Sequence, residues 1–262
     1  MDWQALADEA TRIVTSAGSR GATLRVVGSV GIRLHCAAVA PYLDRFGRQP
    51  KDIDLVVPKA GRRVVRQVLE EGGYRVDRDL LVAMEGRRYA FTHPERAIEV
   101  DVFVDRLDFC HVVEVRDRLT EHPLTLPVEE LLLSKLQVVE PTATDLMDAT
   151  AILLSHRVVA AGPSAPAGGG AGEEPLSAST VAGVLARDWG FHHTAVRNLD
   201  RLAGHAAVLD LTGGERARVV GGTVALLAAV EAAPKTLGWR LRARVGERVQ
   251  WWQDVDEREA TY

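Results

Sequence analysis

The sequence contains little cysteine and little lysine. Its 262 residues include two cysteines, Cys36 and Cys110, both in apolar contexts, so we expect buried free thiols rather than a disulfide. Lysine occurs four times, and arginine supplies the rest of the 32 basic residues. The net charge is only −4, so no overall electrostatic field favours nucleic acid or an anionic membrane, and such a contact requires a local basic patch.

Long hydrophobic runs are also absent. No apolar segment approaches the ~20 residues that span a bilayer, and the N-terminus lacks the basic region and apolar run of a secretory signal. We therefore expect a cytoplasmic protein without membrane contact. A hydrophobic content of 47% and a charged content of 26% are typical of a soluble globular chain, and the length allows one large domain or two ordinary ones.

Helical and strand periodicities alternate along the first part of the chain. Helical spacing predicts helices over residues 2–17, 30–42, 64–69, 128–139 and 144–156, and alternating patterns predict strands over residues 23–27, 52–57, 74–76, 80–84, 88–92 and 98–104, with further short strands at 112–115 and 124–126. This order predicts an α/β or α+β fold in which helices flank a mixed sheet.

The composition changes near residue 160. Residues 160–175 are almost entirely Ala, Gly, Pro and Ser with two Glu, which predicts a flexible linker. Beyond it, helical patterns cover residues 180–187, 191–205, 216–232 and 237–252. We therefore predict a first domain at residues 1–158, a linker at 159–177 and a smaller all-helical domain at 178–262.

Two aspartates stand in the strand pattern of residues 51–57. Side chains alternate along a strand, so Asp52 and Asp54 project to one face while the intervening apolar residues project to the other. Two carboxylates on one face repel each other, and a divalent cation that bridges them would remove this penalty. The alternative is a strand end at which both aspartates are solvated or paired with arginine.

Two further features accompany this pair. The Gly28-Ser29 turn follows a strand and opens a helix, where a hydroxyl and backbone N–H groups suit a phosphate. Asp101 lies on a later strand, with Glu99 on the same face. Three carboxylates from two strands beside such a turn are what two-metal phosphoryl transfer requires.

The motifs Val27-Gly28-Ser29, Asp52-Ile53-Asp54-Leu55 and Val100-Asp101-Val102-Phe103 follow one another in an order that resembles the polymerase-β-like nucleotidyltransferase superfamily. Residues 28–35, 48–54, 126–136 and 145–148 resemble the branch that includes abortive-infection-type (type IV toxin–antitoxin) and antibiotic nucleotidyltransferases. The resemblance covers roughly residues 20–156. It departs from the family in the 22 residues between Ser29 and Asp52, a longer gap than the family's usual one.

The resemblance implies a Mg²⁺-dependent nucleotidyltransferase that moves a nucleoside monophosphate from a nucleoside triphosphate (NTP) to an acceptor hydroxyl and releases pyrophosphate. Asp52 and Asp54 would hold both Mg²⁺ ions. Asp101 would bind the metal at the acceptor and serve as general base, with Glu99 as the rival third carboxylate. Gly28 and Ser29 would bind the β- and γ-phosphates. The alternative is a catalytically silent nucleotide-binding or regulatory protein on the same scaffold.

Other charged residues extend the predicted nucleotide site. Lys135 lies in an apolar run, so it either reaches water or a glutamate, or contacts a phosphate. Asp145 and Asp148, three residues apart on one helix, would orient Lys135 or contact the base, or are solvated. Arg33 either reaches a phosphate or lies on an exposed helix face.

The acceptor is left open among a small hydroxylated molecule, a protein side chain and the 3′ end of a tRNA. The strongest local basic patch combines arginine or lysine with tryptophan, at Lys235, Trp239, Arg240, Arg242, Arg244, Arg248, Trp251 and Trp252. It either contacts RNA phosphates or is a solvated face whose tryptophans pack on the core. The toxin branch also implies that an antitoxin is a candidate partner.

Overall fold

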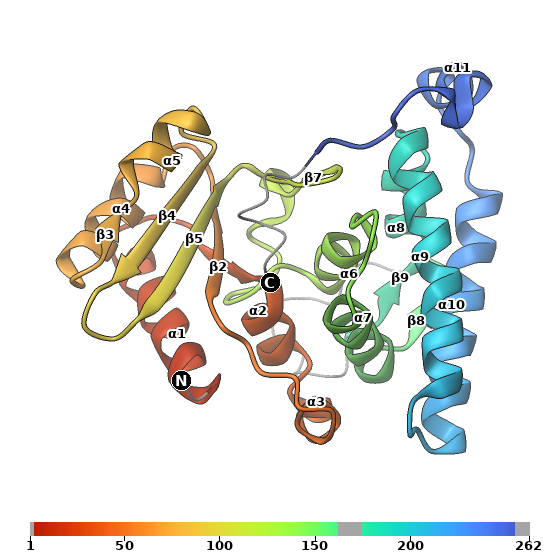
Figure 1. Ribbon diagram of the computed structural model, residues 1–262, viewed down its shortest axis with the longest axis horizontal. Coiled ribbons are helices and arrows are strands. Elements are labelled where there is room, and N and C mark those ends of the chain that lie inside the picture. The colour runs from red at the N-terminus through yellow and green to blue at the C-terminus, as the bar shows by residue number, and fades with distance from the viewer. Residues whose placement is uncertain (1–2, 162–173, 255–262) are drawn as a thin grey trace. The chain divides into compact units, whose positions relative to one another are not determined.

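The computed structural model describes residues 3–161 and 174–254, and its chain divides into two compact units. The first unit comprises Met1–Leu107 and Val113–Pro127, and the second comprises Asp108–Val112 and Val128–Tyr262. Figure 1 labels the elements of both units, which are described separately below.

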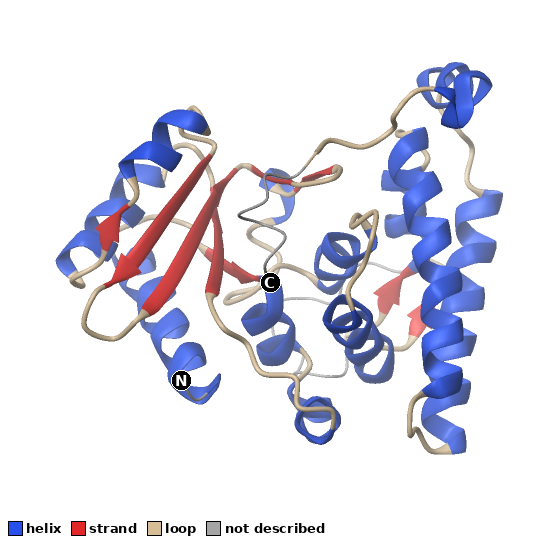
Figure 2. Cartoon of the chain, viewed as in Figure 1, coloured by secondary structure: helices blue, strands red, loops and turns tan. Residues whose placement is uncertain are grey.

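The first unit is built on a five-stranded mixed sheet with the order β1-β2-β5-β4-β3. Its strands, red in Figure 2, are β1 (Arg25–Val27), β2 (Ile53–Val57), β3 (Arg75–Val76), β4 (Arg88–His93) and β5 (Ile98–Val104). β2 and β5 are parallel, and every other pair in the sheet is antiparallel. These strands are rich in β-branched residues, which suit a pleated and largely buried surface.

One face of this sheet forms the hydrophobic core of the first unit. Ile53, Leu55 and Val57 from β2 share the core with the even-numbered residues of β5, as the period of two in a strand requires. Buried residues of α1 (Trp3–Ser19) and α4 (Arg62–Glu71) complete it. The opposite face therefore carries the alternate residues, among them Asp54 and Asp101.

Short helices connect these strands. They are α2 (Gly28–His35), η1 (Ala37–Val39), α3 (Ala40–Arg45) and α5 (Arg78–Ala83). α5 occupies a segment that we predicted as a strand, and this prediction is wrong. The carboxylate of Asp77 accepts hydrogen bonds from the backbone N–H groups of Asp79 and Leu80, so an N-cap starts a helix where the apolar pattern alone indicates a strand.

The second unit is mostly helical. Its helices are α6 (Val128–Leu136), α7 (Ala143–Ser155), α8 (Ala178–Leu185), α9 (Trp189–Val208), α10 (Gly213–Ala232), α11 (Leu237–Val245) and η3 (Gly246–Arg248). Threonine or aspartate side chains cap α7, α9, α10 and α11. Two short parallel strands pair between α7 and α8, namely β8 (Val158–Val159) and β9 (Leu176–Ser177). The remaining elements of the chain are β6 (Arg106–Asp108), β7 (Val112–Glu114) and η2 (Arg116–Arg118).

The predicted fold class is confirmed, because a mixed sheet with helices precedes a helical C-terminal region. The grouping of elements differs from the predicted domains, since α6 and α7 cluster with α8–α10 rather than with the sheet. Most of the predicted linker falls on residues 162–173, which lie outside the described residues. Among the described helices, none alone is long and apolar enough to cross a membrane, although α10 and residues 237–248 meet that criterion together as a pair bent by 101°.

Candidate active site

The sheet register brings Asp54 and Asp101 together. They are Cα partners on the parallel strands β2 and β5, and both belong to the face opposite the core. Partners on neighbouring strands lie about 5 Å apart, so two carboxylates stand side by side there. Asp54 is half-buried, and Asp101 is only 8% exposed. The register thus brings carboxylates from separate chain segments to one face of the sheet.

Gly28 lies directly against Asp54. Val27, the last residue of β1, is the Cα partner of Asp54, and Gly28 then opens α2 with a φ of +61°. A Cβ atom at this position would come within 1.9 Å of Asp54 Oδ2, so a side chain is excluded both by conformation and by space. Glycine thus lets the Asp54 carboxylate reach the first turn of α2, where Ser29 is half-buried and the N-cap residue Val27 provides no side-chain hydrogen bond.

The N-terminus of α2 is an electrostatically favourable place for anions. Its first backbone N–H groups have no partner within the helix, and the helix dipole adds a partial positive charge. The carboxylate of Asp54 benefits from this field, and a phosphate group placed there would benefit in the same way. The Gly28-Ser29 turn therefore opens a helix after a strand, as the sequence predicts, and phosphate binding there stays a prediction.

Arg88 is the residue that sequence reasoning missed. Its Nη2 atom donates to Asp101 Oδ2 at 2.7 Å, and the two side chains are only 8% and 11% exposed. The guanidinium also lies 5.2 Å from the centre of the Phe103 ring. A buried carboxylate requires a cation or several hydrogen-bond donors, and Arg88 supplies the cation in this structure. The signal in the sequence is an arginine directly before the apolar residues 89–91 of the strand, but its partner follows only from the register.

The other two candidate carboxylates are less closely associated with this pair. Asp52 precedes β2 and is half-buried, while Glu99 lies on β5 beside Thr92 and is exposed. Within residues 3–161 and 174–254, no group of three or more His, Cys, Asp or Glu side chains is arranged to hold a metal ion. The Asp54–Asp101 pair nevertheless fits Mg²⁺, which proteins commonly bind through one or two carboxylates together with substrate phosphates.

Arg33 lies inside the protein, which differs from the exposed helix face that was one alternative. Its side chain is 1% exposed and forms an ion pair with Asp44, and its Nη1 atom donates to the backbone oxygen of Arg48 at 3.1 Å. The guanidinium lies 4.1 Å from the centre of the Trp3 ring. In this structure Arg33 therefore connects the chain after α3 to α2 and α1.

Lys135 and Asp148 belong to the second unit. Lys135 Nζ lies 3.0 Å from Asp148 Oδ2 and 3.2 Å from Asp145 Oδ1, so both aspartates orient the lysine, as one of the alternatives predicts. Burial would raise the pKa of Asp145, but the charge of Lys135 and hydrogen bonds from Thr142 outweigh it and lower the pKa below its usual range. Asp145 and Asp148 thus compensate the positive charge of Lys135 within the second unit.

No protein-family model matches this sequence, and no curated protein is similar to it. The case for a function therefore depends on the residues and geometry described above.

Proposed function

We propose that this protein is a Mg²⁺-dependent nucleotidyltransferase that transfers a nucleoside monophosphate from an NTP to an acceptor hydroxyl. The single observation that supports this most strongly is the placement of Asp54 and Asp101 on adjacent parallel strands beside the Gly28-Ser29 turn. It places two of the three predicted carboxylates beside a helix start whose backbone N–H groups favour a phosphate, as phosphoryl transfer with bound metal would use them.

In this proposal, Asp54 and Asp101 bind Mg²⁺, with Asp52 as a further carboxylate at the near end of β2. When bound, the metal would neutralise the charge of the triphosphate and orient it. Ser29 and the first backbone N–H groups of α2 would bind the β- and γ-phosphates. The acceptor oxygen attacks the α-phosphorus, the bond from the α-phosphorus to the bridging oxygen breaks, and pyrophosphate leaves with that oxygen. Asp101 takes the proton of the acceptor hydroxyl.

Arg88 would act as a positioning residue. Its ion pair keeps the buried Asp101 carboxylate charged and oriented before the substrate complex forms. The same ion pair also favours a second candidate, a nucleotide-binding protein without catalytic activity, because it occupies one of the two carboxylates that the chemistry needs. The resemblance also predicts nucleotide binding by Arg33, Lys135 and Asp148, and this stays a prediction. The antitoxin partner stays a prediction as well.

Calorimetric titration with each NTP, with and without Mg²⁺, tests the proposal. We expect binding that requires the metal in the wild-type protein and that is lost in Asp54→Asn and Asp101→Asn. Glu99→Gln is the matched control, because Glu99 is exposed on the strand that carries Asp101 and shares its face. Absence of metal-dependent binding in the wild type, or equal binding in all four proteins, would contradict the proposal.

A second assay separates the two candidates. The protein is incubated with α-labelled NTP and with total RNA, cell lysate or small hydroxylated molecules, and the label is followed. Transfer of label that requires Asp101 supports the enzyme and identifies its acceptor class. Tight metal-dependent binding with no transfer to any acceptor supports the silent scaffold instead.

A further inference from the structure

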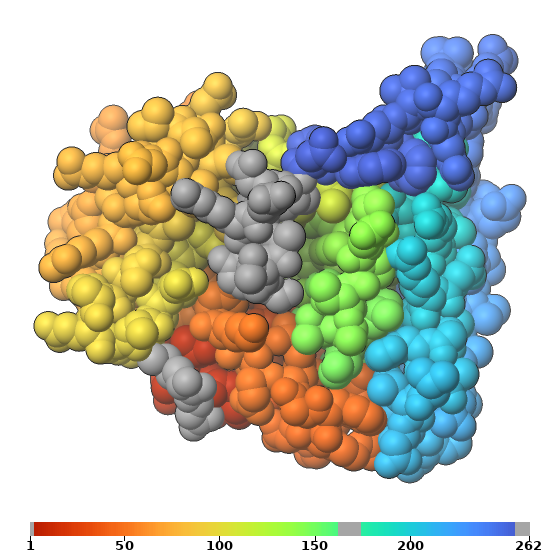
Figure 3. Space-filling model, in the orientation of Figure 1, coloured from red at the N-terminus to blue at the C-terminus, as the bar shows by residue number. Residues whose placement is uncertain are grey.

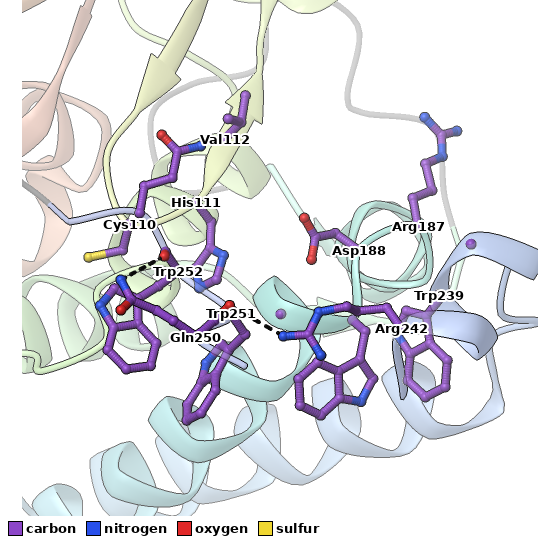
Figure 4. Close-up of a pocket in the computed structure, with 14 residues that line it drawn as sticks. Cys110, His111, Val112, Arg187, Asp188, Trp239, Arg242, Gln250, Trp251 and Trp252 are labelled. Atoms are coloured by element: carbon purple, nitrogen blue, oxygen red, sulfur yellow. Dashed lines mark hydrogen bonds between the residues drawn. The ribbon is translucent and has the colours of Figure 1, made fainter. Parts of the chain in front are cut away.

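A cavity of about 390 Å³ lies within the second unit, where the turn at residues 108–112, the first residues of α9, α11 and the chain after η3 meet. Figure 4 shows its lining residues as sticks. Four of the chain's five tryptophans line the cavity, namely Trp189, Trp239, Trp251 and Trp252. Its volume is in the range of sites that bind small ligands, and its walls combine these indole rings with polar and charged groups.

The tryptophan-bearing segment at 250–253 is held firmly against α9. The indole N–H of Trp251 donates to Thr194 Oγ1 at 3.1 Å, and the backbone N–H of Gln253 donates to the carbonyl of Cys110 at 2.9 Å. A Cβ atom on Gly190 would come within 2.4 Å of the Trp251 carbonyl oxygen, so only glycine allows this approach. Trp252 then stands edge to face with Trp251 at 4.7 Å. The aromatic walls are therefore preorganised.

The titratable groups in the cavity are neutral or already engaged. Burial raises the pKa of the Cys110 thiol, so it stays protonated, and burial lowers the pKa of His111 to about 4, so its ring is neutral at pH 7. Asp188 accepts a hydrogen bond from the backbone N–H of Phe191 as the cap of α9. This chemistry is that of a binding site rather than of a nucleophile.

Two arginines, Arg187 and Arg242, line the cavity. Arg242 lies over the Trp189 ring at 4.8 Å and donates to the carbonyl oxygens of Gly246 and Val249, so it is part of the wall. Arg240 and Arg244 are exposed and four residues apart, which places them together on the face of α11 that points away from the cavity; α11 is blue at the surface in Figure 3. The exposed acid in this segment, Glu247, lies 3.1 Å from His193 Nε2.

We propose that the second unit binds single-stranded nucleic acid, with one unstacked base in the tryptophan-lined cavity, the nearest phosphate on the exposed Arg187 of the cavity wall, and phosphates further along the strand on Arg240 and Arg244. Aromatic rings bind any base through its π-face, and arginines neutralise the backbone phosphates. A duplex keeps its bases stacked and cannot place one in the cavity. An acidic protein partner would use the arginines but not the rings. The proposal does not depend on the transfer reaction proposed above.

Fluorescence anisotropy of a short labelled RNA with the full chain tests this binding. We expect Trp252→Ala to weaken it by at least about 5-fold. The double variant Arg240→Gln with Arg244→Gln should make the slope of log K against log salt concentration less steep by about 1.4, since each phosphate contact on a single strand contributes about 0.7 to this slope. Gly190→Ala should also weaken binding, because it displaces the segment that carries Trp251 and Trp252.

Matched controls lie in α9. A Cβ atom on Gly204 would meet nothing within 4 Å, and Arg197 is exposed, so Gly204→Ala and Arg197→Gln should leave binding unchanged. The arginine double variant alters only exposed side chains, so it tests the proposal even where a cavity variant fails to fold. Absence of RNA binding, equal affinity for the matching duplex, or full affinity in both Trp252→Ala and Gly190→Ala would overturn the proposal. Equal competition by an acidic peptide would assign α11 to a protein partner instead.

Discussion

Arg88→Met removes one partner of the most buried ion pair at the candidate site. The 2.7 Å contact joins two side chains that are 8% and 11% exposed, so the substitution leaves the Asp101 carboxylate buried without its main cation. Breaking such a pair costs about 3 to 5 kcal/mol. For a unit of this size, 3 kcal/mol corresponds to a fall in Tm of about 10 °C. Arg75→Met is the control, because Arg75 is exposed on the same sheet.

The response of Arg88→Met to Mg²⁺ tests whether Asp101 is a metal ligand. If Asp101 is a metal ligand, Mg²⁺ can replace the missing guanidinium, so millimolar Mg²⁺ should raise the Tm of Arg88→Met more than that of the wild type. The double variant Arg88→Met with Asp101→Asn should recover most of the lost stability and should lose the magnesium response. Thermal unfolding followed by circular dichroism measures all three effects. Wild-type stability in Arg88→Met would exclude a stabilising role of the ion pair, and a magnesium response equal to that of the wild type would exclude Asp101 as a metal ligand.

Three further predictions concern other parts of the chain. In urea unfolding, Gly28→Ala should destabilise the protein by at least about 2 kcal/mol more than Gly21→Ala, because both glycines have positive φ but only Gly28 lies against a carboxylate. An equal loss of stability in the two variants would contradict the contact between Gly28 and Asp54. Burial would raise the pKa of Glu9, but hydrogen bonds from two arginines and a tyrosine outweigh it and lower the pKa to about 2. The pKa of Glu9 is lower in the folded than in the unfolded state, so Glu9 stabilises the fold above about pH 4.5 and loses this effect as the pH falls to 2. Glu9→Gln should therefore reduce the loss of unfolding free energy between pH 4.5 and pH 2, and an unchanged loss would exclude this role. Lys135→Met should cost about 3 kcal/mol, because the buried Asp148 and the partly buried Asp145 lose their cation. A smaller loss when one of the two aspartates is also neutralised would support the network, whereas a larger loss would contradict it.

The parts of the fold that follow from strand periodicity could be predicted from the sequence. The alternation in residues 98–104 assigns Asp101 to the face opposite the core, and the same rule assigns Asp54, so the face of each aspartate follows from the local pattern, whereas their pairing depends on the β2–β5 register. Gly28 could be predicted as a turn, but its contact with Asp54 depends on the pairing of β1 with β2. The register of non-adjacent strands is a tertiary property that a local pattern does not contain.

The errors and omissions have the same physical origin. The N-cap at Asp77 overrides a short apolar alternation, because a few hydrogen bonds decide between helix and strand in so short a segment. The partner of Arg88 requires the β4–β5 register, and the burial of Arg33 requires knowledge of the chain after α3. The cavity of the second unit draws residues from separate segments, so its tryptophans give only a compositional signal in the sequence.

The position of a bound metal ion distinguishes a nucleotidyltransferase site at Asp54 and Asp101 from any other arrangement. Crystals grown with Mn²⁺ in place of Mg²⁺ and a non-hydrolysable NTP analogue would locate the ion by its anomalous scattering. The account predicts a peak about 2 Å from carboxylate oxygens of both Asp54 and Asp101, with the analogue's phosphates at the start of α2. A metal bound elsewhere, with Asp101 still paired to Arg88 in the nucleotide complex, would contradict it.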